Sequence, residues 1–245
     1  MTIMKFLNKI ILVFGVLAVS ILYISCSRET PHIAPPGNVS DGATVQVFSA
    51  TVKAARNYVY VDGIPVSGIV FAYGGVFPGT AYGFKVNPGS RSITIKDTLP
   101  ATTQTPLTFT QNMDAGKSYT IFTYDTITST KQLTVVNNIV VPTDTSSRLR
   151  FANLIYNTTA VANVDVYSFR KPGPPVFANI ATTQVTDFIP YASGLTDTLY
   201  VYAAGTTSPL IVKQLVPSLV PTRSYTSVYN GSYRGTKAVT TIATY

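Results

Sequence analysis

The sequence predicts an all-β fold in which two β-sandwich domains follow an N-terminal export signal. Three observations support this prediction. Thr, Tyr and Val are abundant and only 11% of the residues are charged, a composition typical of pleated, half-buried strands. Short runs of alternating apolar residues recur between Pro and Gly turns. The second half of the chain also repeats the pattern of the first.

An apolar run follows two basic residues at the N-terminus. Lys5 and Lys9 precede residues 10–25, which carry no charge and consist largely of Leu, Ile and Val. A basic region followed by an apolar region and small residues is the layout of a secretory signal. We therefore expect residues 1–25 to be a signal peptide. The run is short for a bilayer span, which needs ~20 residues, and an uncleaved anchor is the alternative.

The only cysteine, Cys26, ends this apolar run. The segment "LYISC" resembles a bacterial lipobox, although Tyr23 stands where an aliphatic residue is usual. The resemblance implies that Cys26 is acylated, for example with palmitate, and that its lipid holds the protein on a membrane. Residues 26–43, which contain "APPG" and "SDG", would form a flexible tether. We expect an outer-membrane lipoprotein of the bacterial cell envelope. The periplasmic face is favoured, because no acidic run follows the cysteine.

Alternating strands account for the first half of the chain after this tether. In "TVQVF" Val45 and Val47 share one face, and "NYVYVDG" ends in an Asp62-Gly63 turn. "NPGSRSITIK" turns at Pro-Gly and continues as a strand. "LTFT", "SYTIFTY" and "QLTVV" follow, up to a polar break at "PTDTSS". These runs predict a first sandwich over residues 44–143.

The same pattern starts again after the break, over residues 148–245. "RLRFANL" matches "TVQVFSA", "NVDVYSF" matches "NYVYVDG", and "TRSYTSVYNG" matches "GKSYTIFTYD". The offset from Val47 to Phe151 is 104 residues and that from Tyr60 to Tyr167 is 107. A near-constant offset indicates duplication of a unit of roughly a hundred residues. About six or seven short strands per unit fit an immunoglobulin-like β-sandwich.

The order of motifs in the first half resembles a known family. A strand, a turn and a second strand ("VQVFSA…YVYVDG") precede "NPGSRSITI" and "DAGKSYTIFTY". This order is similar to that of the bacterial domain of unknown function 4397, over most of residues 44–140 and more loosely over residues 148–243. The resemblance implies a β-sandwich that occurs in tandem copies in exported proteins and lipoproteins. It brings no catalytic residues with it.

The basic residues are dispersed along the chain, whose net charge is +8. In "RLRF", Arg148 and Arg150 alternate with Leu149 and Phe151, which predicts that both arginines lie on a solvated strand face. Nucleic-acid binding would need a concentrated basic stripe with aromatic residues between the charges. We therefore expect no nucleic-acid partner.

The residue types missing from the predicted sandwiches argue against catalysis. His32 and Glu29, the only histidine and glutamate, both lie in the tether, and Cys26 is the only cysteine. The commonest general base and the commonest transition-metal ligands are therefore missing. We expect no enzyme activity, no cofactor and no metal site. The alternative is a glycosidase-like hydrolase whose two catalytic aspartates are brought together by folding.

Three Asp-Thr-apolar triplets resemble the sequon of bacterial O-glycosylation, and they make Thr98, Thr126 and Thr198 candidate sites for sugars. The sixteen tyrosines offer either core packing or a stacking surface for a glycan or a protein partner. The terminal run "VTTIATY" raises an outer-membrane β-barrel as a further alternative, which the repeat period and the prolines beside strands disfavour. We expect a non-catalytic, lipid-anchored cell-envelope protein with a binding, adhesion or structural role.

Overall fold

The computed structural model describes residues 41–79 and 83–245. All regular structure in these ranges is β-strand, which confirms the predicted all-β sandwich fold. Within the same ranges no helix is long and apolar enough to cross a membrane. The predicted signal peptide (residues 1–25), Cys26 and nearly all of the predicted tether lie outside the described residues.

The first half of the described chain contains the strands β1 (Ala43–Ser49), β2 (Asn57–Val61), β3 (Ile64–Pro65), β4 (Val76–Phe77), β5 (Phe84–Val86), β6 (Gly89–Asp97), β7 (Leu107–Met113), β8 (Ser118–Tyr124) and β9 (Lys131–Val136). The second half contains β10 (Ser147–Asn153), β11 (Val164–Ser168), β12 (Phe177–Ile180), β13 (Ile189–Tyr191), β14 (Asp197–Ala203), β15 (Val212–Val216), β16 (Ser224–Gly231) and β17 (Lys237–Ala243). Each half thus has more strands than the alternating pattern predicts, because strands of two or three residues carry no visible period. Residues 137–146, which connect β9 to β10, are called the linker below.

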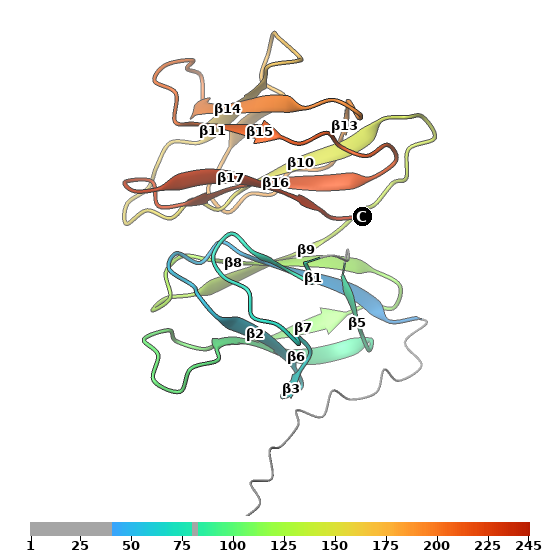
Figure 1. Ribbon diagram of the computed structural model, residues 1–245, viewed down its shortest axis with the longest axis vertical. Coiled ribbons are helices and arrows are strands. Elements are labelled where there is room, and N and C mark those ends of the chain that lie inside the picture. The colour runs from blue at the N-terminus through green and yellow to red at the C-terminus, as the bar shows by residue number, and fades with distance from the viewer. Residues whose placement is uncertain (1–40, 80–82) are drawn as a thin grey trace, which may run out of the picture. The chain divides into compact units, whose positions relative to one another are not determined.

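These strands form four sheets that are stacked in layers (Figure 1). In the first half, β3-β2-β6-β7 form the first outer sheet and β4-β1-β8-β9 form the first inner sheet, where β5 also pairs with β1. In the second half, β13-β10-β16-β17 form the second inner sheet and β12-β11-β14-β15 form the second outer sheet. The first strand of each half is parallel to one neighbour, in the pairs β1·β8 and β10·β16.

The two halves repeat the same strand pairing. Val47 pairs with Ile121 in the first inner sheet, and Phe151 pairs with Ser227 in the second. These positions differ by 104 and 106 residues, close to the offset in the sequence. An isolated bridge between Val52 and Thr126 also recurs as a bridge between residues 156 and 232. The boundaries 44–143 and 148–245 themselves stay a prediction.

Each outer sheet packs on its inner sheet around an apolar core. Buried residues at equivalent positions fill the two cores, because alternate residues of each strand point to the same side of a sheet. The first core includes Val45, Val47, Val59, Ile93 and Ile95, and the second includes Leu149, Phe151, Val166, Leu199 and Val201.

A third core joins the two inner sheets. It consists of Phe48, Ala50, Phe122, Ala152, Leu154, Val228 and Ile242, all of which are buried. The rings of Phe48 and Phe122 meet edge to face, with their centroids 6.2 Å apart. Burial of one such side chain stabilises a fold by roughly 1.5–3 kcal/mol, so this face contributes substantially. The described residues, 41–79 and 83–245, accordingly all belong to one compact unit.

Candidate functional site: a groove at the junction of the two inner sheets

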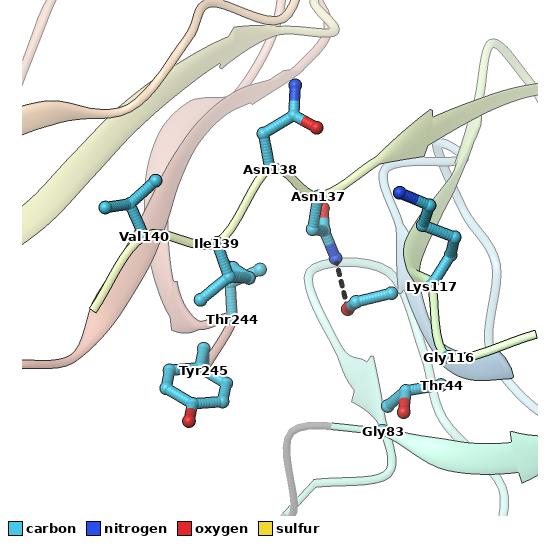
Figure 2. Close-up of a pocket in the computed structure, with 11 residues that line it drawn as sticks. Thr44, Gly83, Gly116, Lys117, Asn137, Asn138, Ile139, Val140, Thr244 and Tyr245 are labelled. Carbon is cyan, nitrogen blue, oxygen red and sulfur yellow. Dashed lines mark hydrogen bonds between the residues drawn. The ribbon is translucent and has the colours of Figure 1, made fainter. Parts of the chain in front are cut away.

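A groove with a volume of about 800 Å³ opens where the linker passes between the two inner sheets (Figure 2). We call it the junction groove. Its walls come from the start of β1, the residue before β5, the β7–β8 turn, the linker and the residues after β17. The lining residues are Thr44, Gly83, Gly116, Lys117, Ser118, Asn137, Asn138, Ile139, Val140, Thr244 and Tyr245.

Two of the residues in the wall of the groove are glycines whose positions disfavour a side chain. A Cβ atom on Gly83 would come within 2.5 Å of Thr44 Cγ2 and 2.9 Å of the backbone oxygen of Val45. Gly116 has a φ of +69°, which is unfavourable for residues with a side chain. The backbone N–H of Gly116 donates to the oxygen of Asp41 at 3.1 Å, which ties this turn to the residues just before β1.

Asn137 forms the floor of the groove. Its side chain is buried, and its Nδ2 donates to Ser118 Oγ at 3.0 Å (Figure 2). Its Oδ1 accepts a hydrogen bond from Thr120 Oγ1 at 3.1 Å and another from Arg150 Nη2 at 2.7 Å. Because Thr120 belongs to β8 and Arg150 to β10, the Asn137 amide connects the linker to both inner sheets.

Arg150 is the charged group behind this floor, and the prediction that it lies on a solvated face is wrong. Arg150 is only 2% exposed, because the outer face of β10 packs against the other inner sheet. Its Nε donates to Thr226 Oγ1 at 2.9 Å, and its guanidinium lies 4.6 Å from the centroid of the Phe188 ring. Burial lowers the pKa of Arg150 to about 10, and the charge of Asp187 opposes this shift.

No carboxylate among the described residues forms an ion pair with Arg150. Neutral oxygens and a ring face stabilise its charge instead. A buried charge of this kind is tolerated only when its hydrogen bonds are kept. The guanidinium therefore fixes the position of Asn137, and with it the shape of the groove.

The rim of the junction groove is mixed in character. Lys117 is exposed on one side, while Val140 is 66% exposed on the linker side. The Tyr245 ring lies 5.9 Å from the guanidinium carbon of Arg223. The groove thus offers hydroxyl, amide and amine groups beside apolar side chains, a mixture typical of ligand-binding sites.

Residues 43–167 match the family model described as "Domain of unknown function (DUF4397)". This match covers about half of the chain. The chain belongs to the DUF4397 family. The resemblance inferred from the motifs is therefore confirmed. No curated protein matches the chain.

The DUF4397 match does not stop at the end of the first sandwich. It starts at β1, crosses the linker and continues through most of β11. It therefore includes Asn137 and Arg150, together with every residue of the junction groove except Thr244 and Tyr245.

A second, smaller groove of about 470 Å³ lies at the other end of β8. Asp125, Lys131 and residues 155–161 line it, with Tyr124, Thr182 and Thr183. Lys131 Nζ lies 2.7 Å from Asp125 Oδ2, so the one aspartate in this groove is already paired. This DUF4397 chain has no cluster of three metal-ligating side chains within residues 41–79 and 83–245.

The aspartates of the three Asp-Thr-apolar triplets all cap nearby backbone. Asp97 Oδ1 accepts from the N–H of Leu99 at 2.9 Å, and Asp125 Oδ1 accepts from the N–H of Thr126 at 2.8 Å. Asp197 is buried and accepts from the N–H of Arg170 at 3.0 Å, from the N–H of Thr198 and from the hydroxyls of Ser168 and Tyr191. These carboxylates therefore hold loops in place.

The structure does not bring the predicted modification sites together. Thr98 is exposed directly after β6, whereas Thr126 is half-buried in the turn after β8. The loops that carry them touch, since the N–H of Thr105 donates to the oxygen of Ile127 at 2.9 Å. Thr198 lies half-buried within β14, in the second half of this DUF4397 chain. Cys26 lies outside the described residues.

Proposed function

We propose that the protein is a non-catalytic, lipid-anchored module of the bacterial cell envelope that binds a protein or glycan partner in the junction groove. The acyl chains on Cys26 would hold it on the outer membrane, with the periplasmic face favoured. No nucleic acid, metal or cofactor enters this proposal. The main support for it is the lining of the junction groove, which offers hydroxyl, amide and apolar groups and no carboxylate side chain.

The wall chemistry supports recognition of a neutral polymer over bond breaking. Thr44, Ser118 and Asn138 supply hydroxyl and amide groups, and Ile139 and Val140 supply apolar surface. Such groups hydrogen-bond to sugar hydroxyls or to the backbone of an extended peptide. Hydrolysis of a glycoside by the usual mechanism needs two carboxyl groups across the cleavage point.

The rival function, hydrolysis by an aspartate pair, finds less support in the described residues. No aspartate lines the junction groove, and Asp125 is the only aspartate that lines the smaller groove. Asp165 accepts from the N–H groups of Asn179 and Gly205 at 2.7 and 2.8 Å, so it has a structural partner for each oxygen. Asp97 is likewise held by Arg56 and Thr102.

The anchor is tested by mass spectrometry of the protein taken from its native membrane fraction, beside a Cys26→Ser variant. We expect a diacylated or triacylated Cys26 at the N-terminus, and release of the variant into the soluble fraction. The same spectra report whether Thr98, Thr126 and Thr198 carry sugar. A chain that still begins at Met1 with an unmodified Cys26 would overturn the anchor.

The groove is tested with soluble peptidoglycan fragments and neutral oligosaccharides as probes, by isothermal titration calorimetry. Thr44→Val removes one hydroxyl from the wall and keeps its shape, and we expect an affinity loss of about tenfold from one lost hydrogen bond. Thr110→Val, on an exposed position of β7, is the matched control. Absence of saturable binding, or an equal loss in both variants, would contradict binding in this groove.

A further inference from the structure

One end of the second half exposes several large apolar side chains on neighbouring loops. Val140 and Val141 of the linker are 66% and 50% exposed. Phe169 follows β11 and is 70% exposed, while Leu195 precedes β14 and Val220 follows β15, at 53% and 54%. We call these five residues the linker-end surface. Isolated exposed apolar residues are ordinary, but a group of them on one face is not.

Backbone hydrogen bonds join the loops that carry these residues to one another or to a neighbouring strand. The N–H of Thr222 donates to the oxygen of Ser146 at 2.8 Å, which joins the β15–β16 loop to the linker. The N–H of Gly194 donates to the oxygen of Leu219 at 2.8 Å, which joins the β13–β14 loop to the β15–β16 loop. The N–H of Phe169 donates to the oxygen of Thr198 at 2.9 Å.

Positive charge accompanies this apolar group. Arg170 and Lys171 are exposed next to Phe169, and Arg148 is half-buried at the start of β10. Lys117 adds an exposed amine across the junction groove. Asp144 of the linker is an exposed negative charge in the same loops, and its Oδ1 accepts hydrogen bonds from the N–H and the hydroxyl of Ser146. Apolar side chains beside cations are the composition that binds the interface of an anionic bilayer.

The chain enters the fold at the same end. Thr44, at the start of β1, lines the junction groove together with Val140 of the linker. Figure 1 shows the start of β1 and the linker on the same side of the structure. Only 14 residues lie between Cys26 and Asp41, and the 15 residue steps span at most about 50 Å when fully extended. Lipid on Cys26 would keep the linker-end surface close to the bilayer, so even a weak contact would be populated.

From these observations we infer that the linker-end surface rests on the bilayer surface that carries the Cys26 lipid, with anionic headgroups facing Arg170 and Lys171. This inference rests on the proposed lipid anchor. It adds a fixed orientation: the junction groove, which shares Val140 with the linker-end surface, opens at the edge of the bilayer, where its partner would bind, and the loops at the opposite ends of the strands face away from the membrane.

Single-cysteine labelling tests this orientation in the full-length lipidated protein, reconstituted into vesicles of phosphatidylethanolamine and phosphatidylglycerol. A fluorophore is placed at Val220→Cys or at Leu210→Cys, and its quenching by headgroup nitroxide lipids is measured. The two positions are matched, because they flank opposite ends of β15 and are 54% and 42% exposed. Acylation leaves Cys26 unreactive towards the label, so each variant carries one fluorophore.

We expect at least twofold stronger quenching at Val220→Cys, and a smaller difference when Arg170 and Lys171 are both replaced by Gln. Equal quenching at the two positions in protein that floats with the vesicles would overturn the docked orientation while leaving the anchor intact. If Cys26 carries no lipid, the anchor fails, and the same labels are placed in a Cys26→Ser chain mixed with the vesicles. Preferential quenching at Val220→Cys then still supports the docking surface, and equal or absent quenching overturns it.

Discussion

Arg150 is the residue on which the junction groove depends most. Its guanidinium donates to oxygens of β8, β16 and the linker, so a single side chain holds three segments in register. A lysine has one ammonium group and cannot reproduce this planar arrangement of donors. The sequence shows an arginine alternating with apolar residues and gives no indication that another sheet covers its face.

We predict that Arg150→Ala lowers the free energy of unfolding by roughly 2–4 kcal/mol, since it leaves a cavity and removes the donors to buried oxygens. Arg150→Met, which fills most of the volume, should lose less. Arg148→Ala on the same strand is the control and should change stability by less than about 1 kcal/mol. Urea denaturation measures all three variants. A loss at Arg148 as large as that at Arg150 would show that burial at the interface is not the cause.

Asp197 gives stability a dependence on acid pH. Burial raises the pKa of this carboxyl, but the hydrogen bonds from Ser168, Tyr191 and the N–H groups of Arg170 and Thr198 more than offset that, so its pKa lies below the ordinary value. The unfolded chain therefore binds a proton at a higher pH than the folded protein does. Its contribution to stability is present above the ordinary pKa of about 4 and is lost as the pH falls through the lower folded value.

Asp197→Asn should accordingly lower the free energy of unfolding at pH 7 by about 1–3 kcal/mol, because the charged acceptor of several hydrogen bonds is removed. The difference between the variant and the natural chain should shrink as the pH falls from 5 towards 2. Guanidinium denaturation at a series of pH values measures it. A difference that stays constant over this range would mean that the carboxylate charge contributes nothing.

At the scale of the strands, sequence pattern predicts the long elements well. The quoted alternating runs coincide with β1, β2, β6, β7, β8, β9, β10, β11 and β16. Short strands such as β3 and β4 have two residues each and offer no period to detect. The outer faces of β1 and β10 are the informative failure, because burial of Phe48 and Ala152 comes from a contact between sheets that no local pattern reports.

For the candidate site too, the sequence predicts features that are local and not those that depend on contacts between distant segments. Cys26 and the Asp-Thr-apolar triplets are visible as short motifs. The junction groove has no such motif, because its residues come from distant segments: the start of β1, the β7–β8 turn, the linker and the residues after β17. A run such as "NNIVV" reads as a simple connection, and only the fold shows that Asn137 is a buried hydrogen-bonding residue.

The β16–β17 hairpin places a backbone constraint on Gly231. Its φ is +107°, and a Cβ atom there would come 2.3 Å from the oxygen of Thr236 and 2.9 Å from the Tyr73 hydroxyl of the first half. We predict that Gly231→Ala costs at least about 2 kcal/mol and lowers the melting temperature by several degrees. Gly235→Ala in the same hairpin is the control, because its nearest neighbour is the Ser232 side chain at 3.4 Å. Thermal denaturation that affects both variants equally would contradict the constraint.

At the scale of the whole molecule, the third core couples the two halves. A ring such as Phe122 is buried by the other inner sheet instead of its own sandwich core. We therefore predict a single cooperative unfolding transition in scanning calorimetry, and a loss of roughly 3–5 kcal/mol for Phe122→Ala. Two well-separated transitions in the natural chain would contradict the coupling.

The contact between the inner sheets is nearly the same when the two halves are exchanged. Gln46 of the first half donates from Nε2 to the backbone oxygen of Ala243 in the second half. Arg150, the counterpart of Gln46 in the repeat, donates in the opposite direction, to Asn137. Thr120 bonds to Asn137, and its counterpart Thr226 bonds to Thr244. Such reciprocity defines an isologous interface, the kind by which identical subunits form a two-fold dimer. The chain therefore has the architecture of a homodimer whose subunits have been joined end to end, and the linker fixes their ratio at one to one.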